Sequence, residues 1–309
     1  MLLRIGVILT APIAATLGAF ALPGIAPRTI RQASVSDMKA LAHYTQFARA
    51  AYCSESKLRA WKCGEACADV PDFQPTLVAG DGGLIQTHFV GFWPEQSAVV
   101  VAHQGTDPMK IAPILTDINI LLVPIDYILF PGAPKGTRVH DGFQLEHGKT
   151  AINIKQEVEK LMELYDIHKI YTIGHSLGGA LAILDGLYLS LQFPDASVET
   201  IVYGAPRVGN AQFADFVSSE LHDLTRVNNK KGKIYPIPAL PPRWLGFKHP
   251  QGEMHFLKLG SAVHCDGEDN DIDDQCTART VHEPVLATGN LLDHLGPYEG
   301  THMGTIYCN

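Results

Sequence analysis

The sequence predicts an α/β fold in which a mostly parallel central sheet carries helices on both faces. Between residues 98 and 203, short β-branched runs alternate with longer stretches of helical periodicity. The run at 169–173 passes through Gly174-His-Ser-Leu-Gly178 into an Ala- and Leu-rich pattern at 179–192, so a strand, a sharp turn and a helix follow one another. With 309 residues, of which 46% are hydrophobic and 18% charged, the chain suits one large domain, which we expect at 36–309.

The remaining elements follow from periodicity and turn residues. A helix is expected at 36–52, because a Ser-Asp pair can cap a segment with apolar positions at helical spacing. Gly and Pro turns separate three β-type runs that would enter the main sheet. The expected strands are 76–78, 84–93, 98–102, 169–173 and 198–203, and the expected helices are 36–52, 150–165 and 179–192.

The first 21 residues have the character of a secretory signal peptide. One positive charge at Arg4 precedes an apolar stretch that ends in an Ala19-x-Ala21 cleavage pattern. A membrane anchor is the alternative, although Pro12 and Gly18 interrupt the apolar run. We therefore expect a secreted, extracellular protein, with residues 22–35 forming a short leader before the domain.

Six cysteines lie beyond the signal segment, which fits an oxidising compartment. Spacing suggests two local disulfides, Cys63–Cys67 and Cys265–Cys276, and would leave Cys53 for Cys308. Six cysteines allow fifteen pairings, so spacing alone does not settle the connectivity. A zinc site at 63–67 is an alternative that lacks a matching second pair of ligands.

Charge and motif content limit the classes of partner. A formal charge of −8 argues against nucleic acid or an anionic membrane surface as an electrostatic partner, and neutral substrates fit better. There is no His-Glu-x-x-His pattern among the fourteen histidines, so we expect neither a metal nor another cofactor. We expect a monomer.

The Gly-x-Ser-x-Gly turn makes Ser176 the candidate nucleophile. In a nucleophile elbow the glycines remove Cβ atoms that would collide with the neighbouring strand and helix, and the serine hydroxyl is exposed above the sheet edge. The backbone N–H of Leu177 would then face a developing oxyanion at the helix N-terminus. The alternative is a glycine-rich turn whose serine merely caps a helix.

A serine hydrolase with such an elbow also needs a base further along the chain. Spacing does not choose among the histidines that follow Ser176. They are His222, His249, His255, His264, His282, His294 and His302.

The segment at 107–135 breaks the alternating pattern. Its apolar part, 118–130, contains Pro124 and is too short to span a membrane. One interpretation is an ordinary buried strand or helix. The other is a mobile apolar flap beside the active site, closed in water and opened against lipid.

Five motifs occur in the order seen in secreted fungal class 3 lipases, and the chain resembles that family over about residues 40–308, most of all its basidiomycete members. Together the motifs are specific. They are Val101-Ala-His-Gln-Gly-Thr106, Val139-His-Asp-Gly-Phe143, Gly174-His-Ser-Leu-Gly-Gly179, Tyr203-Gly-Ala-Pro-Arg-Val-Gly209 and Asp293-His-Leu-Gly-Pro-Tyr298.

The resemblance implies an α/β-hydrolase fold and assigns roles by position. Ser176 would be the nucleophile, His294 the base, and Thr106 with Leu177 the oxyanion site, while residues 107–130 would be a lid over the active site. It also supports the disulfides Cys53–Cys308, Cys63–Cys67 and Cys265–Cys276. His294 could instead be a surface histidine in a glycine-proline loop. We expect His175 to pack within the elbow and His140 to be structural.

The acid of the triad is missing from its matched turn. Related lipases carry Asp in a turn that here reads Arg226-Val-Asn-Asn-Lys-Lys-Gly-Lys-Ile-Tyr-Pro236, with Gly232 or Tyr235 at the acid position. Neither side chain can orient an imidazole as a carboxylate does. Asp223 and Glu253 are speculative substitutes outside the turn. Residues 232–235 replace a single Asp, a net insertion of three that would also result from a misplaced exon boundary.

We therefore expect a secreted lipase that hydrolyses acylglycerol esters through a Ser-His(-Asp) acyl-enzyme. A feruloyl-type esterase is the alternative within the fold. A catalytically impaired, lipid-binding relative is the alternative class, because loss of the orienting acid costs on the order of ten-thousand-fold in turnover.

Overall fold

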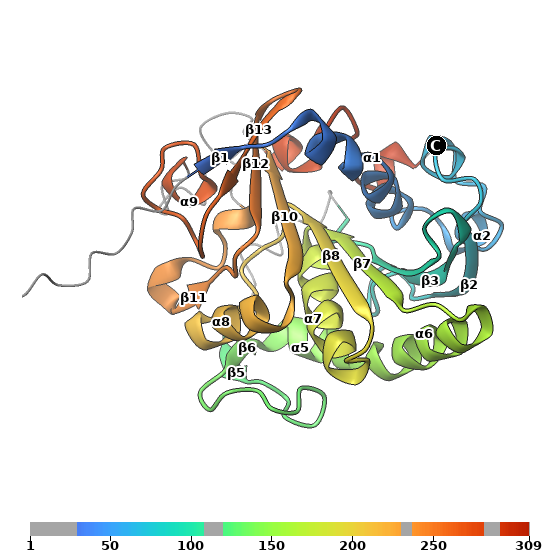
Figure 1. Cartoon of the computed structure of the whole chain (residues 1–309), viewed down its shortest axis with the longest axis horizontal. Helices are drawn as coiled ribbons and strands as arrows, with labels where there is room; N and C mark the ends of the chain where they lie inside the picture. The colour runs from blue at the N-terminus through green and yellow to red at the C-terminus, as the bar shows by residue number, and fades with distance from the viewer. Residues whose placement is uncertain (1–29, 108–119, 230–236, 281–290, 309) are drawn as a thin grey trace, which may run out of the picture.

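The computed structural model describes residues 30–107, 120–229, 237–280 and 291–308. Within them, nine strands form one sheet in the order β1-β13-β12-β10-β8-β7-β4-β3-β2 (Figure 1). Their bounds are β1 Ile30–Gln32, β2 Gln74–Ala79, β3 His88–Trp93, β4 Ala98–His103, β7 Lys169–His175, β8 Ser197–Tyr203, β10 Asp223–Asn229, β12 Glu253–Lys258 and β13 Ser261–Cys265.

The sheet is parallel at its centre and antiparallel at both edges. Strands β4, β7, β8, β10 and β12 run parallel to one another. β2 and β3 on one side, and β13 and β1 on the other, are antiparallel additions. The expectation of a mostly parallel sheet is therefore met at the centre. Short connections join β2 to β3, β3 to β4 and β12 to β13, and antiparallel neighbours of this kind need no crossover helix.

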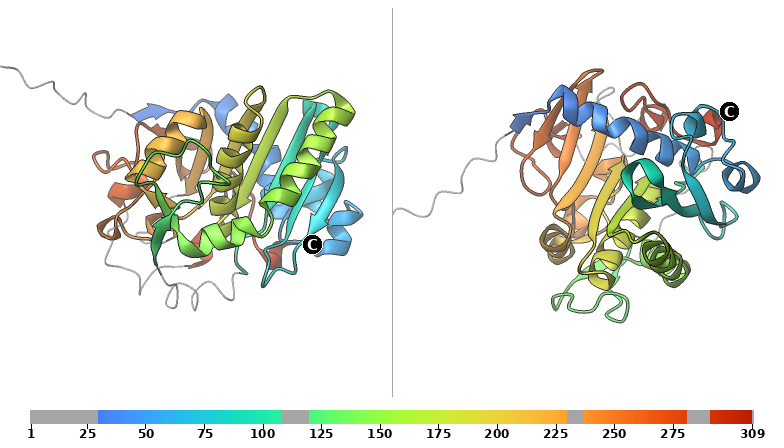
Figure 2. Two further views of the ribbon diagram at one scale, coloured as in Figure 1. Left: turned by 90° about the horizontal axis from the view of Figure 1, so that it is seen from below. Right: turned by 45° about the vertical axis from the view of Figure 1, so that its right-hand side comes forward.

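Helices cover both faces of this sheet, as expected. α1 lies on one face, whereas α6, α7 and α8 lie on the other, and Figure 2 shows these layers from two further sides. The helices described are α1 Val35–Ala50, α2 Glu55–Arg59, α3 Glu65–Ala68, α5 Asp141–Gly148, α6 Ala151–Tyr165, α7 Leu177–Gln192, α8 Ala211–Glu220 and α9 Thr277–Thr280. The short 3₁₀ turns are η1 Pro94–Gln96, η2 Ile237–Ala239, η3 Arg243–Leu245, η4 Leu291–Leu295 and η5 Thr305–Tyr307.

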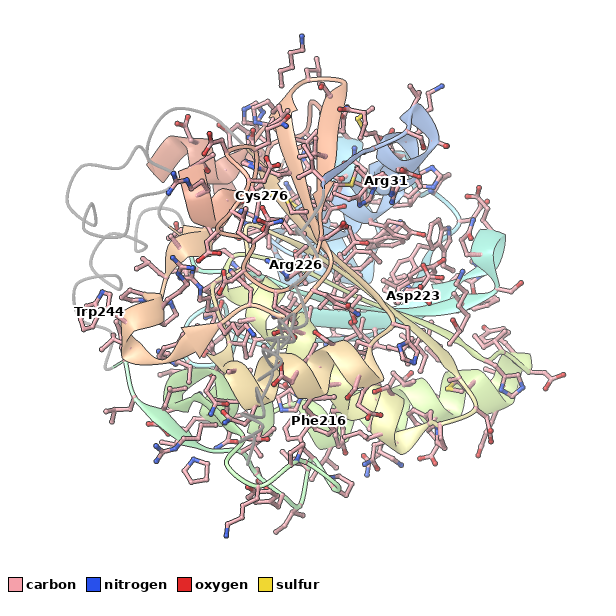
Figure 3. All side chains as sticks on the ribbon, turned by 60° about the vertical axis from the view of Figure 1, so that its left-hand side comes forward. Arg31, Phe216, Asp223, Arg226, Trp244 and Cys276 are labelled. Carbon is pink, nitrogen blue, oxygen red and sulfur yellow. A yellow bond between two sulfur atoms is a disulfide. The ribbon has the colours of Figure 1, made fainter. Side chains whose placement is uncertain are left out.

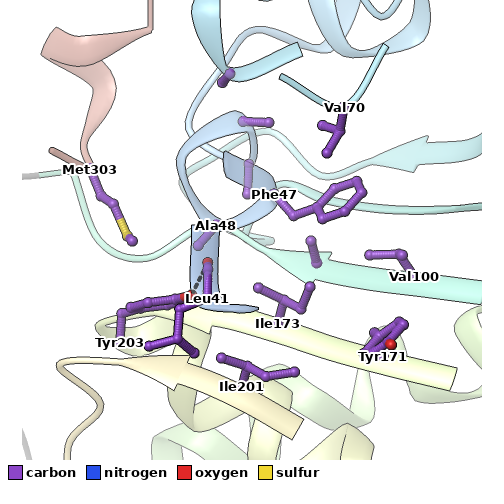
Figure 4. Close-up of a cluster of buried hydrophobic side chains, with 14 of the residues drawn as sticks. Leu41, Phe47, Ala48, Val70, Val100, Tyr171, Ile173, Ile201, Tyr203 and Met303 are labelled. Atoms are coloured by element: carbon purple, nitrogen blue, oxygen red, sulfur yellow. Dashed lines mark hydrogen bonds between the residues drawn. The ribbon is translucent and has the colours of Figure 1, made fainter. Parts of the chain in front are cut away.

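Alternation along β7 explains how one strand serves two hydrophobic cores. Tyr171 and Ile173 belong to the cluster under α1, together with Phe47 (Figure 4). Ile170 points to the opposite face and joins the cluster under α7. Successive side chains of a strand point to opposite faces, so a strand between two helical layers must be apolar at nearly every position. That requirement accounts for the continuous apolar run that the sequence shows here.

A smaller antiparallel sheet contains part of the predicted lid segment. It has the order β11-β9-β6-β5, with β5 Leu122–Pro124, β6 Arg138–His140, β9 Gly209–Asn210 and β11 Phe247–Lys248. Ile125 and Phe130 are buried in the cluster under α7. Part of the apolar run at 120–130 is thus held in strand and core, although Leu121, Tyr127 and Ile128 are exposed. Residues 108–119 lie outside the described residues.

The chain enters the domain earlier than predicted. Residues 30–32, assigned to the leader, form edge strand β1, in which Ile30 pairs with Cys265 and Gln32 with Val263. Helix α1 then begins at a capping box between Ser34 and Asp37, two residues before the expected cap. A three-residue strand is too short to show a period in the sequence. The signal peptide at 1–21 and the rest of the leader to residue 29 lie outside the described residues.

Three disulfides join the same cysteines that the resemblance implies. Cys53 is bonded to Cys308, Cys63 to Cys67 and Cys265 to Cys276. The first bond spans 255 residues and fixes the end of the chain beside the segment that follows α1. The chain between the two cysteines contains every strand of the sheet except β1.

Candidate active site

Ser176 occupies the sharp turn between β7 and α7. Its φ of 60° and ψ of −129° are unusual for a residue with a side chain and store roughly 1–3 kcal/mol of strain. The Ser176 N–H donates to the carbonyl of Tyr203 on β8 (2.9 Å), which ties the turn to the next strand. This geometry is the strained elbow that the Gly-x-Ser-x-Gly pattern predicts.

Close backbone packing explains the two glycines of the pattern. A Cβ atom on Gly174 would lie 2.1 Å from the carbonyl oxygen of Gly178. A Cβ atom on Gly178 would lie 2.3 Å from the carbonyl oxygen of His103 at the end of β4. Strand, elbow and the loop after β4 are therefore in direct contact, and no larger residue fits at either position.

The loop after β4 places Thr106 beside the elbow. Its neighbour Gly105 is so near Ser176 that a Cβ atom there would lie 2.9 Å from the Ser176 Cβ. Thr106 is itself buried, and Gln104 holds the loop through a hydrogen bond from its N–H to the Thr87 carbonyl (2.8 Å). The N–H of Leu177, in the first turn of α7, has no partner within the helix. The loop after β4 and the first turn of α7 thus meet at Ser176.

His294 lies in η4 on the other side of the elbow. Its ring centre is 4.4 Å from that of His175, and its carbonyl oxygen accepts from His175 Nε2 (2.8 Å) and from the Tyr298 hydroxyl (3.0 Å). The His294 side chain is fully buried rather than at the surface. Burial, with a smaller electrostatic contribution from His175, keeps the pKa of His294 well below its usual range, so the imidazole is neutral.

His175 is packed as expected and connects three parts of the site. Because its Nε2 faces a carbonyl oxygen, that nitrogen carries the proton and Nδ1 accepts from the Tyr52 hydroxyl (2.6 Å). Burial lowers the pKa of His175 to about 4, which keeps the ring neutral. The Tyr52 hydroxyl also receives a hydrogen bond from the backbone of Gly105. Tyr52 thus joins the loop after β4 to the His294 turn, a role that no sequence motif indicates.

The two substitute acids are not placed for the triad, so both suggestions are wrong. Asp223 is exposed at the amino end of β10, and Figure 3 labels it and Arg226 along that strand. Ser176 follows the opposite, carboxyl ends of the parallel strands, where Val227 is in register with Tyr203. Asp223 lies four strand residues before Val227, so it is about 13 Å from the end of the sheet that carries Ser176.

Glu253 is already engaged elsewhere. Its carboxylate accepts from the Thr277 N–H (2.8 Å) and lies 3.8 Å from the buried guanidinium of Arg226. Gly232 and Tyr235, the residues at the matched acid position, lie outside the described residues. The preceding residue that the structure describes, Asn229, donates to the Pro297 carbonyl (3.0 Å), so the chain leaves β10 beside the His294 turn.

Other sequence expectations concern metals and membranes. In the described segments, no cluster of three His, Cys, Asp or Glu side chains has the arrangement of a metal site. His140 is buried against Phe143, with ring centres 4.1 Å apart, as expected of a structural residue. No helix among the described residues combines the length and apolar character that crossing a bilayer requires.

The sheet, the elbow and the histidine turn define an α/β-hydrolase with a serine-centred site. A family model for class 3 lipases matches residues 100–243, from β4 through the elbow to η3. Over this segment the chain is similar to the class 3 lipase family.

Two curated relatives come from Malassezia, a basidiomycete genus. The secreted mono- and diacylglycerol lipase MDL2 of Malassezia globosa is 31% identical over 206 residues, which is 64% of this chain and 66% of the relative. The secreted mono- and diacylglycerol lipase LIP2 of Malassezia restricta is 29% identical over 220 residues, covering 70% and 66%. The chain therefore spans about 66% of the length of these relatives.

Solved structures support the fold over nearly the whole chain. A lipase from Rhizopus microsporus var. chinensis superimposes with a TM-score of 0.76 at 25% identity, covering 92% of this chain and 94% of the other. The triacylglyceride lipase of Rhizomucor miehei gives a TM-score of 0.75 at 23% identity, covering 91% and 100%. At that identity the second similarity shows the fold alone.

Proposed function

We propose that the protein is a secreted lipase that hydrolyses the carboxylic esters of acylglycerols through an acyl-enzyme. The observation that carries this proposal is the strained Ser176 with the buried loop 104–106 against it and the His294 turn beside it. These are the parts that acyl transfer needs: a nucleophile, a base and donors for an oxyanion. The names of the Malassezia relatives support the substrate class.

In the first half-reaction, Ser176 Oγ attacks the ester carbonyl while His294 takes the serine proton. The N–H groups of Thr106 and Leu177 stabilise the negative charge on the tetrahedral oxygen. His294 then gives the proton to the departing glycerol oxygen. In the second half-reaction, water attacks the acyl-enzyme by the same route and releases the fatty acid.

Proton transfer makes the missing acid the critical point of this mechanism. When His294 becomes an imidazolium, a positive charge forms in a fully buried position that strongly disfavours it. A carboxylate beside the ring would offset that cost and fix the tautomer. Residues 230–236 contain neither Asp nor Glu, so we infer that turnover is low unless a carboxylate from another part of the chain reaches His294.

The same assignment predicts where the protein acts and in which oligomeric state. The protein acts outside the cell, as a monomer, at a lipid–water interface where acylglycerols are found. The lid is proposed at about 107–130, and in its described part β5 and the buried Ile125 and Phe130 anchor the segment to the fold.

A substrate panel tests this proposal. The full chain is secreted from a eukaryotic host so that the three disulfides form, and is assayed on an emulsified diacylglycerol, an emulsified triacylglycerol and methyl ferulate. We expect fatty-acid release from the acylglycerols and none from Ser176→Ala. Preferred turnover of the ferulate would favour the feruloyl-type esterase. Lipid binding with no hydrolysis would assign the chain to the catalytically impaired class and overturn the proposal.

A further inference from the structure

A buried carboxylate lies on α7, the helix that begins after Ser176. Asp185 has no exposed surface, and it accepts hydrogen bonds from His103 Nε2 (2.5 Å) and His147 Nε2 (3.0 Å). A carboxylate can only accept, so both histidines carry a proton on Nε2. The mechanism above uses none of these three side chains.

The two histidines come from different parts of the fold. His103 is the last residue of β4 and directly precedes the loop 104–106. His147 is on α5, where its ring packs against Phe130 and Tyr188 with ring centres 5.5 Å and 5.8 Å away. One oxygen of Asp185 therefore holds the loop, and the other holds a helix of the core.

His103 contacts α7 at two separate points. Its backbone oxygen lies against Gly178 in the first turn of the helix, and its side chain bonds to Asp185 further along. Gly178 and Asp185 are about two helical turns apart. Two contacts separated along the helix axis restrain both the position and the rotation of the end of β4 relative to α7.

This restraint acts on the two elements that carry the oxyanion donors. The N–H of Thr106 follows β4, whereas the N–H of Leu177 begins α7. Both must lie roughly 2.7–3.1 Å from the same oxygen in the transition state. A misplacement of about 1 Å can cost on the order of 100-fold in rate. A rigid connection between β4 and α7 is therefore a requirement of the chemistry.

We propose that His103 and Asp185 are positioning residues that hold the loop 104–106 in register with the N-terminus of α7, and so set the spacing of the oxyanion donors. This inference rests on the proposed function. His147 shares the same carboxylate but does not touch the loop, so it contributes stability without setting that spacing.

The ionised state of Asp185 maintains its hydrogen bonds to both histidines. Burial alone would raise the pKa of Asp185. Electrostatic interactions and hydrogen bonds with His103 and His147 outweigh this effect and hold the pKa well below its usual range. The carboxylate is thus ionised wherever the protein is folded near neutral pH, and both hydrogen bonds persist. His88 stacks on His103 with ring centres 5.7 Å apart and restrains its ring further.

The test compares the two histidines that share one carboxylate. His103→Leu and His147→Leu each remove one hydrogen bond to Asp185 and one buried imidazole. Each variant is assayed for kcat and KM on a soluble p-nitrophenyl ester, for inhibition by a phenylboronic acid, and for Tm. The boronic acid forms a tetrahedral adduct on a catalytic serine, so its affinity reports the oxyanion geometry.

We expect His103→Leu to lower kcat and boronic acid affinity by roughly 10- to 100-fold with little change in KM. His147→Leu should lower Tm while leaving boronic acid affinity close to that of the wild type. His103→Gln should recover most of the kcat, because its Nε2 can still donate to Asp185, and it serves as the readout if His103→Leu fails to fold.

Equal losses of boronic acid affinity in the two leucine variants would overturn the inference and assign the network to stability alone. So would a His103→Leu variant that retains wild-type kcat. Wild-type turnover is measured first. If the wild type hydrolyses the ester and His103→Leu matches it, this inference fails while the proposed function stands. If the wild type is inert, both fail.

Discussion

In Tyr52→Phe, the loss of one hydroxyl should break the hydrogen bonds that join the loop after β4 to His175, while the shape of the side chain stays the same. The hydroxyl donates to His175 Nδ1 and accepts from the Gly105 backbone, and Tyr52 is buried. Its loss leaves two buried polar groups unpaired, at roughly 1–3 kcal/mol each. We therefore expect the free energy of unfolding to fall by about 2–6 kcal/mol. We also expect kcat to fall roughly tenfold or more, because His175 would no longer hold the His294 carbonyl in place.

The matched control is Tyr171→Phe. Tyr171 is equally buried, and its hydroxyl bonds to Tyr44 under α1, away from Ser176. Both variants are compared by urea denaturation and by steady-state kinetics at a temperature where each is folded. Tyr171→Phe should lose stability and keep its kcat. If Tyr52→Phe also kept the kcat of the wild type, the connection from the loop through His175 to His294 would have no catalytic role.

Three further predictions concern the acid, a buried ion pair and the longest disulfide. Replacing residues 232–235 by a single Asp should raise kcat by orders of magnitude if the insertion removes the triad acid, and an unchanged kcat would show that a carboxylate is already supplied. Burial would raise the pKa of Asp269, but its interactions with His249 and Arg207 lower that pKa to about 2. The resulting stabilisation of about 2.5 kcal/mol is complete above the unfolded pKa near 4 and is lost as pH falls towards 2. Urea denaturation at pH 7 and pH 3 should show about half of this loss in the wild type and a smaller one in Asp269→Asn. Removing the disulfide that spans 255 residues, in Cys53→Ser/Cys308→Ser, should lower the free energy of unfolding by about 5 kcal/mol on the chain-entropy model. Removing the local disulfide within 63–67 should lower it by about 2 kcal/mol, and equal losses in the denaturation midpoints would contradict this order.

The sequence was sufficient for the elbow because its chemistry lies in one contiguous stretch. A β-branched run, a Gly-x-Ser-x-Gly turn and an Ala-rich helix each have a local signature, and the structure places β7, Ser176 and α7 accordingly. The helix at 150–165 and the strand at 198–203 were equally clear, since each is long and periodic. His294 was assignable through a motif and not through spacing.

The residues around the site were not predictable in the same way. Tyr52, His103, His147 and Asp185 come from four separate places in the chain and meet only through the sheet topology. One signal was present, namely an Asp in the middle of the apolar helix 177–192, where a buried charge requires partners. The sequence also did not show that part of the predicted lid segment packs into the core. An apolar run beside a candidate site can serve the core as well as lipid, and periodicity does not distinguish the two.

Covalent labelling shows whether Ser176 is an activated nucleophile. The secreted chain is incubated with a fluorophosphonate, digested and analysed by mass spectrometry, alongside Ser176→Ala and heat-denatured protein. We expect one stoichiometric adduct on Ser176, absent from both controls, together with loss of diacylglycerol hydrolysis. An unlabelled Ser176 in folded protein, or hydrolysis that persists in Ser176→Ala, would contradict this expectation.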